Sequence, residues 1–180
     1  MKSALFQTEQ WVNASLDRTF RFFADPQNLS KISPPWSGAR LLEARLVLPP
    51  PNPYGPGNRE VVPNLAGAGS EIVVSFFWFP YLPIRASWTA RIVEFEWNRY
   101  FRDIQIRGPF RLFDHNHSFE QSDRNERPGT LVRDTISYDV GLAAAGRLLN
   151  ASVIRMQLAA MFRYRQRATA QLLKSAERSL

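Results

Sequence analysis

The stretch RYFRDIQIRGPFRLFDHNHSFEQ, residues 99–121, predicts two β-strands joined by a tight turn. Residues 99–107 and 110–121 both alternate apolar and polar side chains, and Gly108-Pro109 supplies the turn between them. Similar runs, also bounded by short turns, flank this stretch at residues 70–79, 84–95 and 129–140. Five consecutive strands with short connections predict an antiparallel meander.

Segments at the two ends of the chain complete this arrangement. Residues 4–12 predict an edge-type strand, and residues 13–36 predict two short helices separated by an Asp-Pro pair. Residues 38–48 favour one more strand. Residues 146–178 predict one long amphipathic helix, with an apolar stripe and arginines over much of its remaining surface. One such helix can cover one face of a curved sheet.

The sequence therefore predicts an α+β fold, in which a curved antiparallel sheet of six to seven strands wraps around the C-terminal helix. We expect residues 1–180 to form a single domain. Residues 49–69 interrupt the pattern with six of the 13 prolines and four of the 9 glycines. Because neither side of this segment completes a core alone, we expect an insert and not a linker. Inserts of this length are usually lids, portals or disordered segments.

Composition narrows the class of protein. Hydrophobic residues make up 44% of the chain and charged residues 22%, as in an ordinary globular protein, but the aromatic fraction of 13% is high. So many large rings suit a thick core or a wide apolar cavity. Cysteine is absent, which excludes disulfides, thiolate catalysis and cysteine-ligated metal sites. With no apolar run of signal-peptide or membrane-spanning length, we expect a cytoplasmic protein.

The formal net charge of +7 could favour a nucleic acid or an anionic lipid surface. The arginines are, however, spread along the predicted strands and the last helix, and no run of Lys or Arg occurs. We therefore expect no nucleic-acid partner and keep binding to an anionic surface as an alternative. We also expect a monomer or a weak homodimer.

Five segments carry a resemblance to a known family: FFADPQNLSKISPPW, SWTARI, FRDIQIRGPFRLFDHNHSF, LVRDTISYDV and FRYRQRA. Together they resemble the ligand-binding SRPBCC family, which is related to START domains, polyketide cyclases and the birch-pollen allergen. The resemblance covers nearly the whole chain and implies a helix-grip fold with a deep apolar cavity. Two features depart from the family pattern. Phe113 and Asp114 stand where Trp and His are expected, and the 49–69 segment is longer than the usual connection.

Both histidines of the chain lie in one predicted strand, two positions apart. Because alternate residues of a strand share a face, His115 and His117 lie on the same side as Phe113 and Phe119. This aromatic side is the expected interior. Asp114 lies on the opposite face, so the apparent Asp-His-His cluster is separated by the alternation of the strand.

In the next predicted strand, Asp134 is the one charged residue of an otherwise apolar inward set. If the hairpin turn centres near residues 125–126, His117 lies opposite Asp134 and His115 lies opposite Ile136. We predict a contact between His117 and Asp134 across the hairpin. This pair could anchor a polar group of a ligand, act as an acid and base, or only satisfy two buried polar groups.

The strand over residues 99–107 leaves two faces open as the interior. One face holds Phe101, Asp103 and Gln105, and the other holds Tyr100, Arg102, Ile104 and Ile106. The apolar count favours the second face, whereas the Phe-x-Asp-x-Gln pattern of the family favours the first, with Asp103 as a polar cavity residue. His-x-His could offer two nitrogens to a metal ion, but only carboxylates could complete the ligand set. We predict no metal site and no cofactor.

These features predict a non-enzymatic binding protein that holds a hydrophobic small molecule, lipid-like or aromatic, between the sheet and the C-terminal helix. The predicted ligand-binding residues are Phe76, Trp78, Trp88, Asp103, Phe113, His115, His117, Phe119, Asp134, Tyr138, Leu158, Met161 and Phe162. The alternative is an enzyme of the polyketide cyclase, aromatase or dehydratase type. In that case, His117 and Asp134 are the best candidates for catalytic residues.

Overall fold

The computed structural model describes residues 3–54, 64–77, 84–141 and 144–175. Its elements follow the predicted order of strand, short helices, antiparallel strands and long C-terminal helix. In chain order they are β1 (Ala4–Val12), α1 (Leu16–Ala24), α2 (Asn28–Lys31), the 3-10 helix η1 (Pro35–Ser37), β2 (Arg40–Arg45), β3 (Glu71–Phe77), β4 (Arg85–Glu96), β5 (Tyr100–Arg107), β6 (Leu112–Arg124), β7 (Arg127–Asp139) and α3 (Ala144–Ser175).

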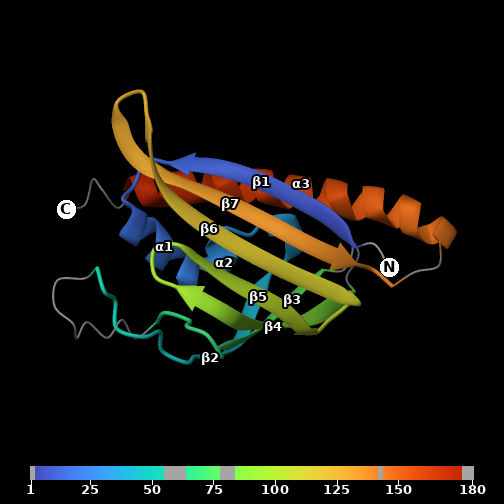
Figure 1. Cartoon of the computed structure of the whole chain (residues 1–180). Coiled ribbons are helices and arrows are strands. Elements are labelled where there is room, and N and C mark those ends of the chain that lie inside the picture. The colour runs from blue at the N-terminus through green and yellow to red at the C-terminus, as the bar shows by residue number, and fades with distance from the viewer. Residues whose placement is uncertain (1–2, 55–63, 78–83, 142–143, 176–180) are drawn as a thin grey trace.

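All seven strands belong to one antiparallel sheet with the order β1-β7-β6-β5-β4-β3-β2. Strands β3 to β7 therefore form the predicted meander, β2 extends it beside β3, and β1 adds to the other edge beside β7. The sheet curves around α3, which runs along one of its faces (Figure 1). This is the helix-grip arrangement that the sequence predicts.

The β6–β7 hairpin sets the register of the centre of the sheet. Arg124 pairs with Arg127, so Asn125 and Glu126 alone form the turn. Both turn residues have positive φ angles, 52° for Asn125 and 60° for Glu126. Two residues in this conformation give the type I′ turn, whose twist matches that of the flanking strands. The resulting register places His117 opposite Asp134, as the hairpin alignment predicts.

Side chains alternate along β6 as its sequence predicts. Phe113, His115, His117 and Phe119 are buried, whereas Leu112 is 44% exposed. On the outer face, Asp114 binds Arg102 of β5 through two hydrogen bonds of 2.7 and 2.8 Å. The inner face of β6 therefore looks toward the interior of the fold.

Two clusters of buried side chains fill the ends of that interior. The first surrounds Phe20 of α1, whose ring lies 5.1 Å from Phe119 and 5.9 Å from Phe101, between ring centroids. The second joins β1, β6 and β7 to α3, with Phe6 and Phe162 5.3 Å apart. Both clusters contribute side chains to the wall of a cavity that lies between the sheet and the helices.

The predicted 49–69 insert is described only outside residues 55–63. Its described parts are bound to the rest of the fold. Trp97 donates a hydrogen bond of 2.7 Å to the carbonyl of Pro50, and the amide of Ala66 donates one of 3.0 Å to Ala24. No helix among the described residues, α3 included, combines the length and the apolar character needed to cross a membrane.

Candidate ligand-binding site

A cavity of about 520 Å³ lies between the inner face of the sheet, the short helices and α3. This volume is typical of sites for small molecules. Most of its lining is aliphatic or aromatic. One reason for the open space is that Ala90, a small residue, stands between Trp88 and Ile92 on the inner face of β4.

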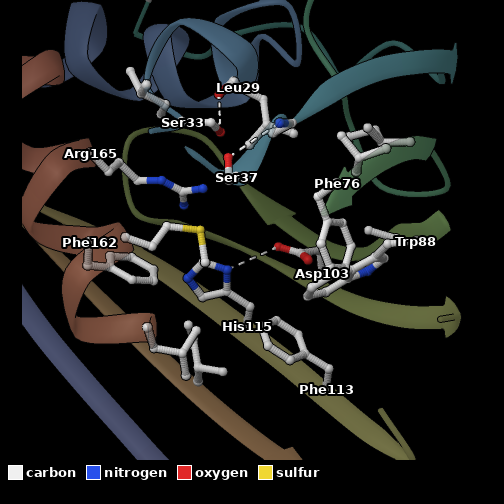
Figure 2. A pocket seen from close by; sticks show the side chains of 18 of the residues that line it. Leu29, Ser33, Ser37, Phe76, Trp88, Asp103, Phe113, His115, Phe162 and Arg165 are labelled. Carbon is white, nitrogen blue, oxygen red and sulfur yellow. Dashed lines mark hydrogen bonds and ion pairs between the residues drawn. The ribbon is translucent and has the colours of Figure 1, made fainter. Parts of the chain in front are cut away.

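Nine of the predicted ligand-binding residues line this cavity: Phe76, Trp88, Asp103, Phe113, His115, His117, Leu158, Met161 and Phe162. Figure 2 shows Phe76, Trp88 and Phe113 on one side of the cavity and Phe162 on the other, with His115 between them. The Trp88 ring lies edge-on to Phe113, with centroids 4.3 Å apart, and 6.0 Å from Phe76. These rings form an aromatic wall built by β3, β4 and β6.

The other four predicted residues are placed differently. Phe119 and Tyr138 lie in the two packed clusters and not on the cavity wall, because their faces of β6 and β7 are covered by α1 and by neighbouring aromatic rings. Asp134 lies against the two histidines, and it does not line the cavity either. Trp78 lies outside the described residues.

Three adjacent strands bring the polar residues of the site together. His115 of β6 pairs with Asp103 of β5, and His117 of β6 pairs with Asp134 of β7. Paired residues of an antiparallel sheet point to the same side, so all four side chains lie on the inner face. The two imidazole rings lie side by side with their centroids 3.8 Å apart.

Asp134 contacts both histidines through one oxygen. His115 Nε2 forms a hydrogen bond of 3.1 Å with Asp134 Oδ1, and His117 Nδ1 lies 2.6 Å from the same oxygen. The second contact is close, but the ring N–H direction of His117 is not aligned for a hydrogen bond. The predicted contact between His117 and Asp134 is present, and the structure adds His115 to it.

Asp103 lies on the other side of the imidazole pair. Its Oδ2 atom lies 3.8 Å from His115 Nδ1 and 3.6 Å from His117 Nε2. The family pattern thus indicated the inner face of β5 correctly, whereas the apolar count did not, since Ile106 on the other face is 36% exposed. The pairing of Asp103 with Ile92, which is 3% exposed, explains this choice of face.

The two histidines differ in their affinity for a proton. Burial lowers the pKa of His115, and repulsion from His117 lowers it further. Burial also opposes a charge on His117, but the Asp134 and Asp103 carboxylates outweigh it and raise the pKa of His117. Burial alone would raise the pKa of Asp134, yet attraction to His117 and His115 lowers it. Protonation is therefore favoured at His117 over His115, and ionisation is favoured at Asp134.

Arg165 is a cavity residue that the sequence interpretation missed. Its side chain extends from α3 toward the middle of the cavity (Figure 2). The guanidinium lies 4.9 Å from the Phe162 ring, and its buried Nε has no hydrogen-bond partner among the described residues. Burial lowers the pKa of Arg165, although the carboxylates of Asp134 and Asp103 oppose this effect. Helical spacing could have identified Arg165 from the sequence, because position 165 lies on the same inward stripe of α3 as Leu158 and Met161.

Chemically, the site is an apolar chamber with one polar centre. The centre offers two imidazoles of different basicity, two carboxylates and one guanidinium, all on rigid strands or on α3. It can donate hydrogen bonds to a polar group of a ligand, and it can exchange protons through His115 and His117.

The fold is of the helix-grip class, and a family match indicates a hydrophobic ligand-binding or polyketide cyclase-like protein. The chain belongs to the family described as polyketide cyclase / dehydrase and lipid transport, whose model matches residues 12–162. A comparison with curated proteins gives no match.

Solved structures share the fold. Protein CV1439 from Chromobacterium violaceum is similar with a TM-score of 0.62 and 12% identity, over 94% of this chain and 96% of its own. Protein Ms6760 from Mycobacterium smegmatis is similar with a TM-score of 0.61 and 13% identity, over 98% of each chain. Ara h 8.0201 is similar with a TM-score of 0.57 and 9% identity, over 96% of this chain and 99% of its own. At these identities, the likeness concerns the fold alone.

Proposed function

We propose that this protein binds a hydrophobic small molecule, lipid-like or aromatic, in the cavity between the sheet and α3. The observation that carries the proposal is the cavity of about 520 Å³ with mostly apolar walls. Burial of apolar surface contributes roughly 25 cal/mol per Å². A ligand that buries a few hundred Å² would therefore gain several kcal/mol before the costs of association.

The polar groups on the cavity wall support a ligand with one polar end. Arg165 Nε and Trp88 Nε1 are buried donors without a hydrogen-bond partner within the described part of the chain. An unsatisfied buried donor costs about 1–3 kcal/mol, which a ligand oxygen would recover. His117 and Arg165 both favour an anionic or oxygen-rich group at that end.

Native mass spectrometry of protein purified from its own host tests this proposal directly. We expect a bound small molecule that dissociates on denaturation. Filling the cavity gives a second test: Ala90→Phe adds a ring to the inner face of β4, whereas the matched control Ser87→Phe adds the same ring to an exposed position of that strand. We expect Ala90→Phe alone to abolish binding of the neutral fluorophore Nile red. A wild-type chain that binds no apolar molecule would overturn the proposal.

A second candidate function is catalysis of the cyclase or dehydratase type, in which His117 would move protons. Two imidazoles whose pKa values are shifted in opposite directions lie on the cavity wall, where they could donate and accept protons, and this favours catalysis. A His117→Ala variant that binds the ligand normally but loses turnover would support catalysis. Genes for a polyketide synthase beside the gene for this protein would support it independently.

A further inference from the structure

We propose that Asp103, His115 and His117 form a binding site for a divalent transition-metal ion, such as Zn²⁺ or Fe²⁺, on the wall of the cavity. Two imidazole nitrogens and one carboxylate oxygen are a donor set that such ions accept, and they leave further coordination positions open. This inference goes beyond ligand binding, and it departs from the prediction from sequence, which gave no metal site because only carboxylates could complete the ligand set.

The geometry of the three donor atoms supports the site. Asp103 Oδ2 lies 3.6 Å from His117 Nε2 and 3.8 Å from His115 Nδ1, and all three atoms lie within 4.8 Å of one another. Ligand atoms about 2.1 Å from a tetrahedral zinc ion stand about 3.4 Å from each other. Small side-chain rotations would therefore bring the three atoms around one ion.

The separations also show that these atoms do not satisfy one another. Both distances from Asp103 exceed a normal hydrogen bond. The hydrogen bond from His115 Nε2 to Asp134 places the ring proton on Nε2, so Nδ1 presents its lone pair toward Asp103. Lone pairs of a nitrogen and a carboxylate oxygen thus face each other in a buried site. A cation between them removes this repulsion.

The charges around the cluster favour a cation as well. Two carboxylates, Asp103 and Asp134, lie against the imidazole pair, and both act electrostatically on the Arg165 guanidinium. A proton on His117 is the rival cation, and metal binding would displace it.

Asp134 has the position of an outer carboxylate. It holds His115 from the side opposite to the proposed ion, as carboxylates behind metal-bound histidines commonly do. The three donors come from two adjacent strands and so are rigidly placed. The remaining coordination position would face the cavity, where water or the polar end of a ligand could bind.

The composition of the chain makes a direct test possible. The two histidines are the only ones present and cysteine is absent, so zinc has no other imidazole or thiolate to bind. Chelator-treated protein without a histidine tag is titrated with zinc chloride in a calorimeter and with cobalt chloride in a spectrophotometer. We expect one ion per chain with a dissociation constant of about 1 µM or tighter, and visible absorption bands of bound Co²⁺.

Variants locate the ion. Asp103→Asn, His115→Gln and His117→Gln each should weaken zinc binding more than tenfold, and Asp134→Asn should weaken it by about 10–100-fold. The control Asp114→Asn lies on the outer face of β6 and should leave the affinity for zinc unchanged. Absence of stoichiometric binding by the wild type overturns the proposal, whether or not every variant folds. Binding that Asp103→Asn and His115→Gln leave unchanged also overturns it, because the ion then lies elsewhere.

Discussion

Asp134 forms its hydrogen bond with His115, 3.1 Å away on the diagonal of the hairpin, although the register places Asp134 opposite His117. The same carboxylate oxygen, Asp134 Oδ1, therefore contacts both imidazole rings. This shared oxygen links the histidines into one unit, so a change at Asp134 acts on both.

Removal of the Asp134 carboxylate should destabilise the fold. Asp134 is 4% exposed, and its loss would remove the carboxylate that contacts both buried imidazoles. We expect Asp134→Ala to lower the free energy of unfolding by about 3 kcal/mol, measured by urea denaturation. The control Asp114→Ala breaks a partly exposed pair with Arg102 and should cost about 1 kcal/mol or less. Equal effects of the two substitutions would contradict this account.

The two histidines should titrate in opposite directions from an ordinary histidine in metal-free protein. We expect His117 to become neutral above, and His115 below, the ordinary pKa of about 6.5. The stability that His117 contributes is complete below the pKa of the unfolded state. It is lost as the pH rises through the higher pKa of the folded state. NMR titration of the two imidazole ring protons measures both values, and coincident midpoints would refute the assignment.

Aromatic residues in the packed cluster and on the cavity wall should differ in their contribution to stability. Phe20 is 0% exposed and contacts several other rings, so Phe20→Ala should cost about 4 kcal/mol. Phe76 is partly exposed to the existing cavity, and Phe76→Ala should cost only about 1–2 kcal/mol. Urea denaturation measures the free energy of unfolding of both variants. Only Phe76→Ala should also weaken binding of Nile red, and a reversed order would argue against the cavity.

The β6–β7 turn offers a stabilising substitution. Glu126 has a φ of 60°, a conformation that costs a non-glycine residue about 1–2 kcal/mol. We expect Glu126→Gly to raise the free energy of unfolding by about 0.5–1 kcal/mol, since the greater freedom of glycine in the unfolded chain offsets part of the gain. Thermal and urea denaturation measure the change. Glu126→Ala retains a Cβ atom and should give no such increase.

Arg165 should determine whether the cavity prefers anionic molecules. Arg165→Met keeps the length of the side chain but removes its charge. We expect weaker binding of the anionic fluorophore anilinonaphthalene sulfonate, by about tenfold or more, and unchanged binding of neutral Nile red. Arg163→Met, at an exposed position of α3, is the matched control. Equal losses for both fluorophores would mean that Arg165 shapes the cavity and does not select a charge.

Much of the fold follows from local patterns in the sequence. Alternation within 110–121 assigned the inner face of β6, and the position of the turn at residues 125–126 aligned His117 with Asp134. Both inferences depend only on residues that are close together in the sequence. The face of β5 did not follow in this way, because both faces of that strand carry apolar and polar residues and its register with β4 shifts at bulges.

The polar centre was predictable only in part. The contact of His117 with Asp134 lies within one hairpin, whereas the approach of Arg165 requires α3 to dock across the sheet. Arginine on a helix is usually a surface residue, and nothing local distinguishes Arg165 from exposed Arg163 except its alignment with Leu158 and Met161. Phe119 and Tyr138 share the inner face of the sheet with the cavity residues, but other rings cover them.

The polar centre and the apolar chamber differ in where their parts lie along the chain. Asp103, the two histidines and Asp134 all come from β5, β6 and β7, so two consecutive hairpins suffice to bring them together. The chamber closes only when α3 packs on β1, which lies at the other end of the chain. Contacts between near neighbours form faster than those that close long loops. We therefore expect the polar centre to form before α3 closes the chamber, so that a hydrophobic ligand can enter the core while the chain is still folding.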